Sequence, residues 1–277
     1  MDIIQAITLG VVQGLTEFLP ISSTAHLALV PWFFHWKDPG LTFDVALHVG
    51  TFLAVAVYFR QDLIQMAMSW LSSFRKFDRT DPYQMLSWLV IFGCIPAVVA
   101  GLLLDDLIGG VFRSPYVIAA TLIGVGILIA IAEKFTKHTR TWKDMTFKDA
   151  MLIGLAQAFA LIPGTSRSGA TITMGLFLGL ERADAARFSF LLGFPVIFGS
   201  AVFKLKDVAH DPAAAAQLPM MGVGVAAAAI SGYLCIRFLM RFLQTNTMMV
   251  FVYYRIVLGV IILALLWSGQ ALPVHAE

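Results

Sequence analysis

The chain has 277 residues and a net charge of +2, with 59% hydrophobic and only 13% charged residues. An ordinary soluble domain carries about 25% charged residues, so this composition excludes a soluble globular protein and makes the bilayer the solvent. So small a net charge also gives no reason to expect a nucleic-acid partner.

The predicted elements are six full membrane crossings and two interrupted apolar regions, all of them helical. The first half holds one interrupted region and three crossings, at 3–34, 43–59, 85–104 and 116–132. The second half repeats this order, at 150–180, 188–203, 220–236 and 249–267. Pro, Gly, Ser and Thr interrupt both regions, which favours helical hairpins that enter and leave the membrane by the same face. Because non-helical backbone at membrane depth needs protein or a wet cavity around it, a site is expected at these breaks.

The two interrupted regions resemble each other. The segment 9–13 (LGVVQ) aligns with 153–157 (IGLAQ) at an offset of 144 residues, and a proline followed by a hydroxyl cluster comes after each. We therefore expect a single membrane domain over 1–277, built from two repeats at approximately 1–140 and 141–277. Three crossings in each half is an odd number, so the second repeat should be inverted relative to the first.

The basic residues indicate which side of the membrane each joint faces. Thirteen Lys and Arg residues lie in four joints, at 60–84, 133–150, 181–187 and 237–247. Four others, on the opposite side, are Lys37, Arg113, Lys204 and Lys206. The side richer in basic residues is predicted to be cytoplasmic, which places both termini outside.

The first break carries groups suited to nucleophilic catalysis. Gln13 and Glu17 are four residues apart and share a helix face before the turn at Pro20. Four polar residues follow that turn: Ser22, Ser23, Thr24 and His26. A hydroxyl nucleophile close to base candidates is what covalent phosphoryl or acyl transfer requires. The alternative is that the hydroxyls satisfy backbone groups freed by Pro20, although ionisable groups inside a span usually mark a substrate or ion pathway.

The second break has the composition of a phosphate site. Its sequence, PGTSRSGAT, is a turn that contains Gly164, Ser166, Arg167, Ser168 and Thr171. Glycine allows a close approach of the backbone to phosphate oxygens, a helix start offers N–H groups, and a guanidinium binds two oxygens at once. The alternative is a structural ion pair between Arg167 and Glu17. Hairpins entering from opposite faces would bring the two breaks into one pocket near the midplane. Two further ionisable residues are candidates for this pocket, His48 and Arg255.

On these motifs the chain resembles the bacterial undecaprenyl-diphosphate phosphatase family, the bacitracin-resistance type of membrane phosphatase. The resemblance covers nearly the whole chain and rests on TEFLPISSTAH at 16–26, PGTSRSGAT at 163–171 and the arginine of YRIV at 254–257. It implies hydrolysis of undecaprenyl diphosphate to the monophosphate carrier lipid of cell-wall synthesis. It also implies the bacterial inner membrane, a site that opens to the periplasmic or outer face, and a divalent cation, Mg²⁺ or Ca²⁺.

The resemblance also implies residue roles. Glu17 and His26 become acid/base or metal-side residues, Ser23 the candidate nucleophile and Arg167 the phosphate clamp, while Ser23 and His26 stay alternatives for the attacking group. The expected substrate contacts are Gln13, Ser22, Thr24, His48, Gly164, Ser166, Ser168, Thr171 and Arg255. Where the family has either a Glu or a Gln, this chain has Gln13, so Glu17 is the expected metal-binding carboxylate and metal affinity without substrate should be weak.

A transporter is the competing class. Inverted repeats with broken helices at the midplane also build carriers, so a lipid-phosphate transporter or flippase that uses the same pocket is the alternative. The lipid substrate and membrane lipid are the expected partners, and a homo-oligomer is left open.

Overall fold

The computed structural model describes residues 1–37, 39–103, 114–210 and 212–269. Within these residues the fold consists of eleven α-helices and one short 3-10 helix. A single isolated bridge, Arg140 to Leu180, is the extent of β-pairing in the described chain. The predicted end of the second crossing at residue 104 and the basic residue Arg113 lie outside the described residues.

The helices follow the predicted order closely. The first half contains α1 (Ile3–Phe18), α2 (Ser23–Phe33), α3 (Leu41–Tyr58), α4 (Arg60–Ser73), α5 (Pro82–Leu103) and α7 (Pro115–Phe135). The second contains η2 (Trp142–Asp144), α8 (Phe147–Phe159), α9 (Arg167–Phe177), α10 (Arg182–His210), α11 (Pro212–Phe242) and α12 (Met249–Trp267). Both interrupted regions are therefore helix-turn-helix units.

One segment differs from the sequence prediction. The residues 60–84 were expected to form a polar joint, but they contain α4, which leaves the direction of α3 by 78°. The polar residues of this segment lower its hydropathy, so the hydropathy pattern alone did not indicate a helix there. Tyr83 donates a hydrogen bond to Asp62, and Arg187 forms an ion pair with the same carboxylate, so this helix is tied to α5 and α10.

Several helices are long and apolar enough to cross a membrane. Four pass this test, α5, α7, α12 and the part of α11 from Gln217, and the bent pair α3–α4 is a fifth if it is one span. At most 39% of each of the four apolar windows is buried inside the protein. Such apolar surface would be unfavourable in water and suits a lipid surrounding. The chain is thus a multi-pass helical membrane protein.

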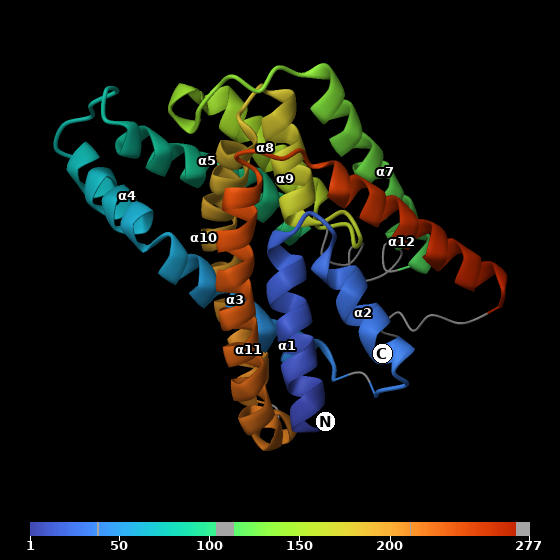
Figure 1. The fold of residues 1–277 in the computed structure, drawn as a ribbon. Helices are drawn as coiled ribbons and strands as arrows, with labels where there is room; N and C mark the ends of the chain where they lie inside the picture. Colours follow the sequence, from blue (N-terminus) through green and yellow to red (C-terminus); the bar gives the residue numbers. More distant parts are fainter. Residues whose placement is uncertain (38, 104–113, 211, 270–277) are drawn as a thin grey trace.

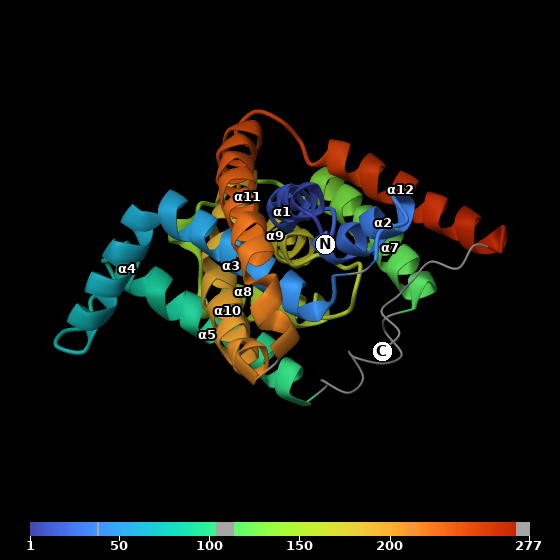
Figure 2. The ribbon, with the colours of Figure 1, turned by 90° about the horizontal axis from the view of Figure 1, so that it is seen from below.

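The two hairpins occupy the middle of the bundle and point at each other. In Figure 1 α1 rises from the lower end and turns back as α2, whereas α8 descends from the upper end and turns back as α9. Figure 2, seen from below, shows α1, α2 and α9 between α3, α10 and α11 on one side and α7 and α12 on the other. The joins α4–α5, α7–α8, α9–α10 and α11–α12 lie at the upper end in Figure 1. The four basic segments of the sequence cover these joins together with parts of the helices next to them.

Small residues let the hairpin arms approach other helices closely. A Cβ at Gly10 of α1 would lie 2.5 Å from the carbonyl oxygen of Gly224 in α11. A Cβ at Gly154 of α8 would lie 2.2 Å from the carbonyl oxygen of Gly93 in α5. Close contact of this kind is typical of helix association in membranes, where packing replaces the hydrophobic effect. Each first arm is therefore fixed against a crossing helix from the other half.

The α8–α5 contact gives a stability prediction. We expect Gly154→Ala to lower the melting temperature in detergent, because the added methyl group meets backbone that cannot rotate away, at a cost of about 1–3 kcal/mol. Gly124→Ala in α7 is the matched control, since a Cβ there has open space within 4 Å. Equal melting temperatures for the two variants would contradict the close packing of α8 on α5.

The turns before α2 and α9 share an unusual backbone. Both helices have 11 residues, and each begins directly after a serine with positive φ, 75° at Ser22 and 70° at Ser166. Positive φ is uncommon for a residue other than glycine. The two serines are 144 positions apart, the offset of the sequence repeat. This local match supports the expected two-repeat organisation, which stays a prediction.

Candidate active site

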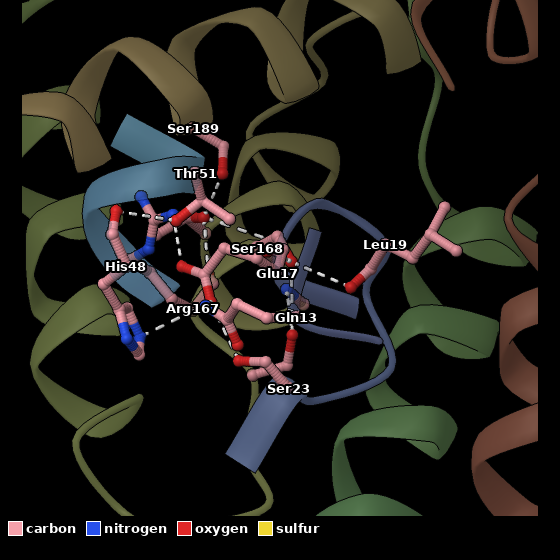
Figure 3. A network of polar contacts seen from close by, with 12 residues as sticks. Gln13, Glu17, Leu19, Ser23, His48, Thr51, Arg167, Ser168 and Ser189 are labelled. Atoms are coloured by element: carbon pink, nitrogen blue, oxygen red, sulfur yellow. Dashed lines mark hydrogen bonds and ion pairs between the residues drawn. The ribbon is translucent and has the colours of Figure 1, made fainter. Parts of the chain in front are cut away.

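Glu17 is the centre of a polar cluster between the two hairpin tips (Figure 3). Its carboxylate is 8% exposed and receives three donors. Ser23 Oγ and Gln13 Nε2 donate to Oε2 at 2.8 and 3.2 Å, and Arg167 Nη2 donates to Oε1 at 2.9 Å. The expected helix face of Gln13 and Glu17 is thereby realised. A serine hydroxyl and a carboxylate at this distance have the geometry that a nucleophile and its general base require.

Arg167 reaches Glu17 through a notch in α10. Gly193 lies behind the guanidinium, and a Cβ at that position would be 1.1 Å from Nη1 and 2.3 Å from Cζ. Nη2 holds Glu17, but the buried Nη1 makes no hydrogen bond within the described residues. The ion pair expected as the structural alternative therefore exists, and it leaves one donor nitrogen without an acceptor.

His48 stands at the edge of the cluster. Its Nε2 lies 3.8 Å from Glu17 Oε2, and its side chain is 39% exposed. Its Nδ1 lies 2.8 Å from the carbonyl oxygen of Asp44, which can only accept, so Nδ1 carries the proton and the Nε2 lone pair faces Glu17 when the ring is neutral. His48 is thus brought to the site from α3, as the sequence analysis expected.

Arg255 lies between the two hairpin tips and α7. The guanidinium is fully buried and donates to the carbonyl oxygens of Pro20 in the first tip and of Gly164 and Thr165 in the second, at 2.9–3.1 Å. Further bonds reach the carbonyl oxygens of Leu122 and Thr121 in α7. Its donors thus serve backbone carbonyls, and Arg255 joins the two tips to α7; its contact with substrate stays a prediction.

The remaining hydroxyls of the second tip are also engaged within the protein. Ser168 donates to the carbonyl oxygens of Glu17 and Leu19 in the first tip, at 3.3 and 3.1 Å. Ser166 accepts a capping bond from the Gly169 N–H, and Thr171 is fully buried against Ser189 of α10. Each hydroxyl thus has a partner within the protein: Ser168 in the first tip, Ser166 at the start of α9 and Thr171 on α10. Their expected contacts with substrate stay predictions.

Gly164 is required by the turn. Its φ is +84°, and a Cβ there would lie 2.2 Å from Thr121 Oγ1. Glycine alone fits such a conformation and such contact without strain. The turn thus comes close to α7, and the expected phosphate contact of Gly164 stays a prediction.

In the first tip His26 and Glu17, which the sequence placed together, make separate contacts. His26 Nδ1 lies 2.7 Å from the carbonyl oxygen of Ser22, and its Nε2 lies 2.6 Å from the hydroxyl of Tyr254 in α12. The His26 ring therefore bonds away from Glu17. Ser22 is 1% exposed and supports the turn, whereas Thr24 is exposed on α2. Between the two alternatives for the attacking group, the geometry favours Ser23.

The site offers a hard divalent cation few protein ligands. Within the described residues, no three His, Cys, Asp or Glu side chains come together to hold a metal ion. Gln13 Oε1, however, is buried and makes no hydrogen bond within those residues, while Nε2 of the same amide donates to the Glu17 carboxylate. Carboxylate and amide oxygens are ligands of Mg²⁺ and Ca²⁺, and Mg²⁺ sites commonly take their other ligands from phosphates and water.

Taken together, the fold and the site define a multi-pass membrane protein with a serine–carboxylate pair and an arginine between two membrane hairpins. The chain belongs to the family described as bacitracin resistance protein BacA, whose model matches residues 6–261. It is 49% identical to an undecaprenyl-diphosphatase of Teredinibacter turnerae, over 95% of this chain and 98% of that protein. It is 46% identical to an undecaprenyl-diphosphatase of Myxococcus xanthus, over 99% and 92% of the two chains. An undecaprenyl-diphosphatase 2 of Stutzerimonas stutzeri is 48% identical, over 97% and 100%.

Two residues at the site were not predicted from sequence. Gly193 forms the notch for Arg167, and Tyr254 bonds His26. Glycine is common in membrane helices, so Gly193 gives no separate signal in the run LLGFP. Tyr254 adjoins Arg255 in a segment that the sequence did single out, and a tyrosine hydroxyl inside an apolar span is the signal that could have identified it.

Proposed function

We propose that this protein hydrolyses undecaprenyl diphosphate to undecaprenyl phosphate and inorganic phosphate. The relatives reported above are named undecaprenyl-diphosphatases, and the similarity to this chain covers nearly their whole length. The observation that carries the proposal is the contact of Ser23 with Glu17 at 2.8 Å, beside a guanidinium nitrogen that has no acceptor among the described residues. The product would be the carrier lipid of cell-wall synthesis, which fits a bacitracin-resistance family.

Ser23 is the proposed nucleophile. Its oxygen attacks the terminal phosphorus while Glu17 takes the hydroxyl proton, and the bond from that phosphorus to the bridging oxygen breaks. Undecaprenyl phosphate leaves, and water then hydrolyses the phosphoserine to regenerate Ser23 and release inorganic phosphate. Gln13 and Arg167 orient Glu17, so the base is fixed by two further side chains, as in other hydroxyl nucleophile sites.

Arg167 is the proposed clamp for the transferred phosphoryl group. Its Nη1 needs an acceptor, and a phosphate oxygen supplies one with the charge and geometry that a guanidinium binds best. Charge on the phosphoryl oxygens is spread in the transition state, so a preorganised donor stabilises it more than the ground state. His48, with Nε2 directed at Glu17, would lie beside the bound diphosphate.

A divalent cation, Mg²⁺ or Ca²⁺, is part of this proposal. Glu17 and the amide oxygen of Gln13 would hold it together with substrate phosphates and water, and it would supply positive charge next to the phosphate oxygens. With one carboxylate and one amide from the protein, binding in the absence of substrate should be weak.

The proposed placement in the membrane has six crossings, α3, α5, α7, α10, α11 and α12, with the hairpins α1–α2 and α8–α9 entering from opposite faces. The basic joins at the upper end of Figure 1 would face the cytoplasm of a bacterial inner membrane. The site would then open toward the periplasm, and the polyprenyl chain would extend sideways into lipid.

A transporter would use the same pocket differently. It needs phosphate ligands but has no use for a serine hydroxyl bonded to a carboxylate. The Ser23–Glu17 contact therefore favours hydrolysis over transport as the function of this cluster.

Phosphate release by purified protein in detergent tests the proposed function. We expect release from undecaprenyl diphosphate that stops with a chelator and returns with Mg²⁺ or Ca²⁺, because the cation would supply positive charge beside the phosphate oxygens and would be held by Glu17 and Gln13. Calorimetry with Mg²⁺ alone should show little or no binding. Absence of phosphate release under every metal condition would overturn the hydrolase proposal, and full activity in the chelator would remove the cation from it.

A further inference from the structure

The hydrogen bond between His26 and Tyr254 joins the first hairpin to α12. The hydroxyl of Tyr254 lies 2.6 Å from His26 Nε2, and the two rings stack with centroids 5.6 Å apart and an interplanar angle of 13°. His26 is part-buried on α2, and Tyr254 is 44% exposed on α12. An ionisable ring inside a membrane segment is costly and calls for a specific role.

Both ring nitrogens of His26 are occupied. The carbonyl oxygen of Ser22 can only accept, so His26 Nδ1 carries a proton and donates it to that oxygen. In the neutral ring Nε2 must then accept from the hydroxyl of Tyr254. The carbonyl that His26 holds belongs to the peptide unit that leads into Ser23. A continuous line of bonds thus runs from the Tyr254 hydroxyl to the backbone that presents Ser23.

The second hairpin shows that the turn itself does not need this imidazole. Ser166 adopts a φ of 70°, close to the 75° of Ser22, yet the residue that corresponds to His26 at the offset of 144 is Ala170. There the Ser166 side chain caps the helix by accepting from the Gly169 N–H, whereas Ser22 makes no such side-chain bond. The imidazole is therefore specific to the hairpin that carries Ser23.

We propose that Tyr254 is a positioning residue for catalysis, which acts through His26 and the Ser22 carbonyl to fix the orientation of Ser23 toward Glu17. This inference rests on the proposed hydrolase function. The bond survives a change in protonation of His26, because an Nε2–H would donate to the Tyr254 oxygen instead. Tyr254 thus holds Ser23 in place throughout the proton transfers of the reaction.

The test replaces the Tyr254 hydroxyl alone. Tyr254→Phe keeps the stacked ring, so we expect an unchanged melting temperature in detergent and unchanged KM for undecaprenyl diphosphate, with kcat lower by about tenfold. Tyr253→Phe is the matched control, because Tyr253 is next to Tyr254 in the sequence and is 64% exposed, and this variant should have parental kinetics. A His26→Ala background completes the cycle: Tyr254→Phe should have little further effect on kcat there.

Two results would overturn the inference. Parental kcat in Tyr254→Phe would show that the hydroxyl is not needed, and an equal loss of kcat with and without His26 would show that Tyr254 does not act through the imidazole. A lower melting temperature with kcat unchanged per folded molecule would leave a structural tie only. In all these cases the parent protein still releases phosphate, so failure of the inference is distinct from failure of the hydrolase proposal.

Discussion

Ser23→Ala should lower kcat for phosphate release by roughly 10⁴-fold or more, the order seen when a covalent nucleophile is removed from a hydrolase. The hydroxyl donates to Glu17 at 2.8 Å, so the variant loses the attacking atom while the backbone of the turn is kept. Glu17→Gln should cost a similar factor, because an amide cannot take the proton. The measurement is kcat and KM with undecaprenyl diphosphate, alongside melting temperature.

Neighbouring hydroxyls provide the comparison for this prediction. Thr24→Ala changes an exposed residue and Ser22→Ala changes one that supports the turn, so both should lose much less than Ser23→Ala. Rapid quenching followed by mass spectrometry should place a phosphoryl group on Ser23 in the parent protein. Near-parental turnover by Ser23→Ala would exclude Ser23 as the nucleophile and give that role to His26 or to water.

The fold was largely predictable because hydropathy and breaker residues act locally. Apolar runs of spanning length indicated the long apolar helices α5, α7, α11 and α12, and Pro20 and Pro163 marked the positions of both turns. The helix α4 was not predicted, since its residues 60–73 mix polar and apolar side chains and its stability comes from contacts with Tyr83 and Arg187. Such tertiary contacts leave no local periodic signal.

The residue types of the site could be predicted from the sequence, but the hydrogen-bond partners of each residue could be predicted less well. Glu17, Ser23 and Arg167 do converge, as motifs on two opposed hairpins suggested. Arg255 was expected among the substrate contacts because a lone ionisable group inside a span usually marks a substrate or ion pathway. Carbonyl oxygens of two turns accept its hydrogen bonds, and which backbone groups a turn leaves unpaired depends on conformations that sequence does not display, such as the positive φ at Gly164.

The notch at Gly193 allows the role of Arg167 to be tested without changing its charge. A methyl group at this position would lie 1.1 Å from Nη1 and 2.3 Å from Cζ, so the guanidinium has to move. The atoms displaced are the far end of a flexible side chain, which can rotate away at small cost in folding free energy. We therefore expect Gly193→Ala to keep a melting temperature near that of the parent while Arg167 loses its alignment with Glu17.

Loss of one preorganised donor to the transferred phosphoryl group costs about 3 kcal/mol, so kcat of Gly193→Ala should fall by about 10²-fold. Arg167→Lys, which keeps the charge without the planar fork, should fall by a similar factor, and Arg167→Ala by more. Gly199→Ala, on the same helix and with open space within 4 Å of a Cβ, is the matched control and should retain parental kcat. Because the guanidinium and its pair with Glu17 are the groups that a methyl group at Gly193 displaces, parental activity in Gly193→Ala, or in Arg167→Lys, would reduce Arg167 to a counter-ion of Glu17. Catalysis would then rest on Ser23 and Glu17 without a contribution from the Arg167 guanidinium.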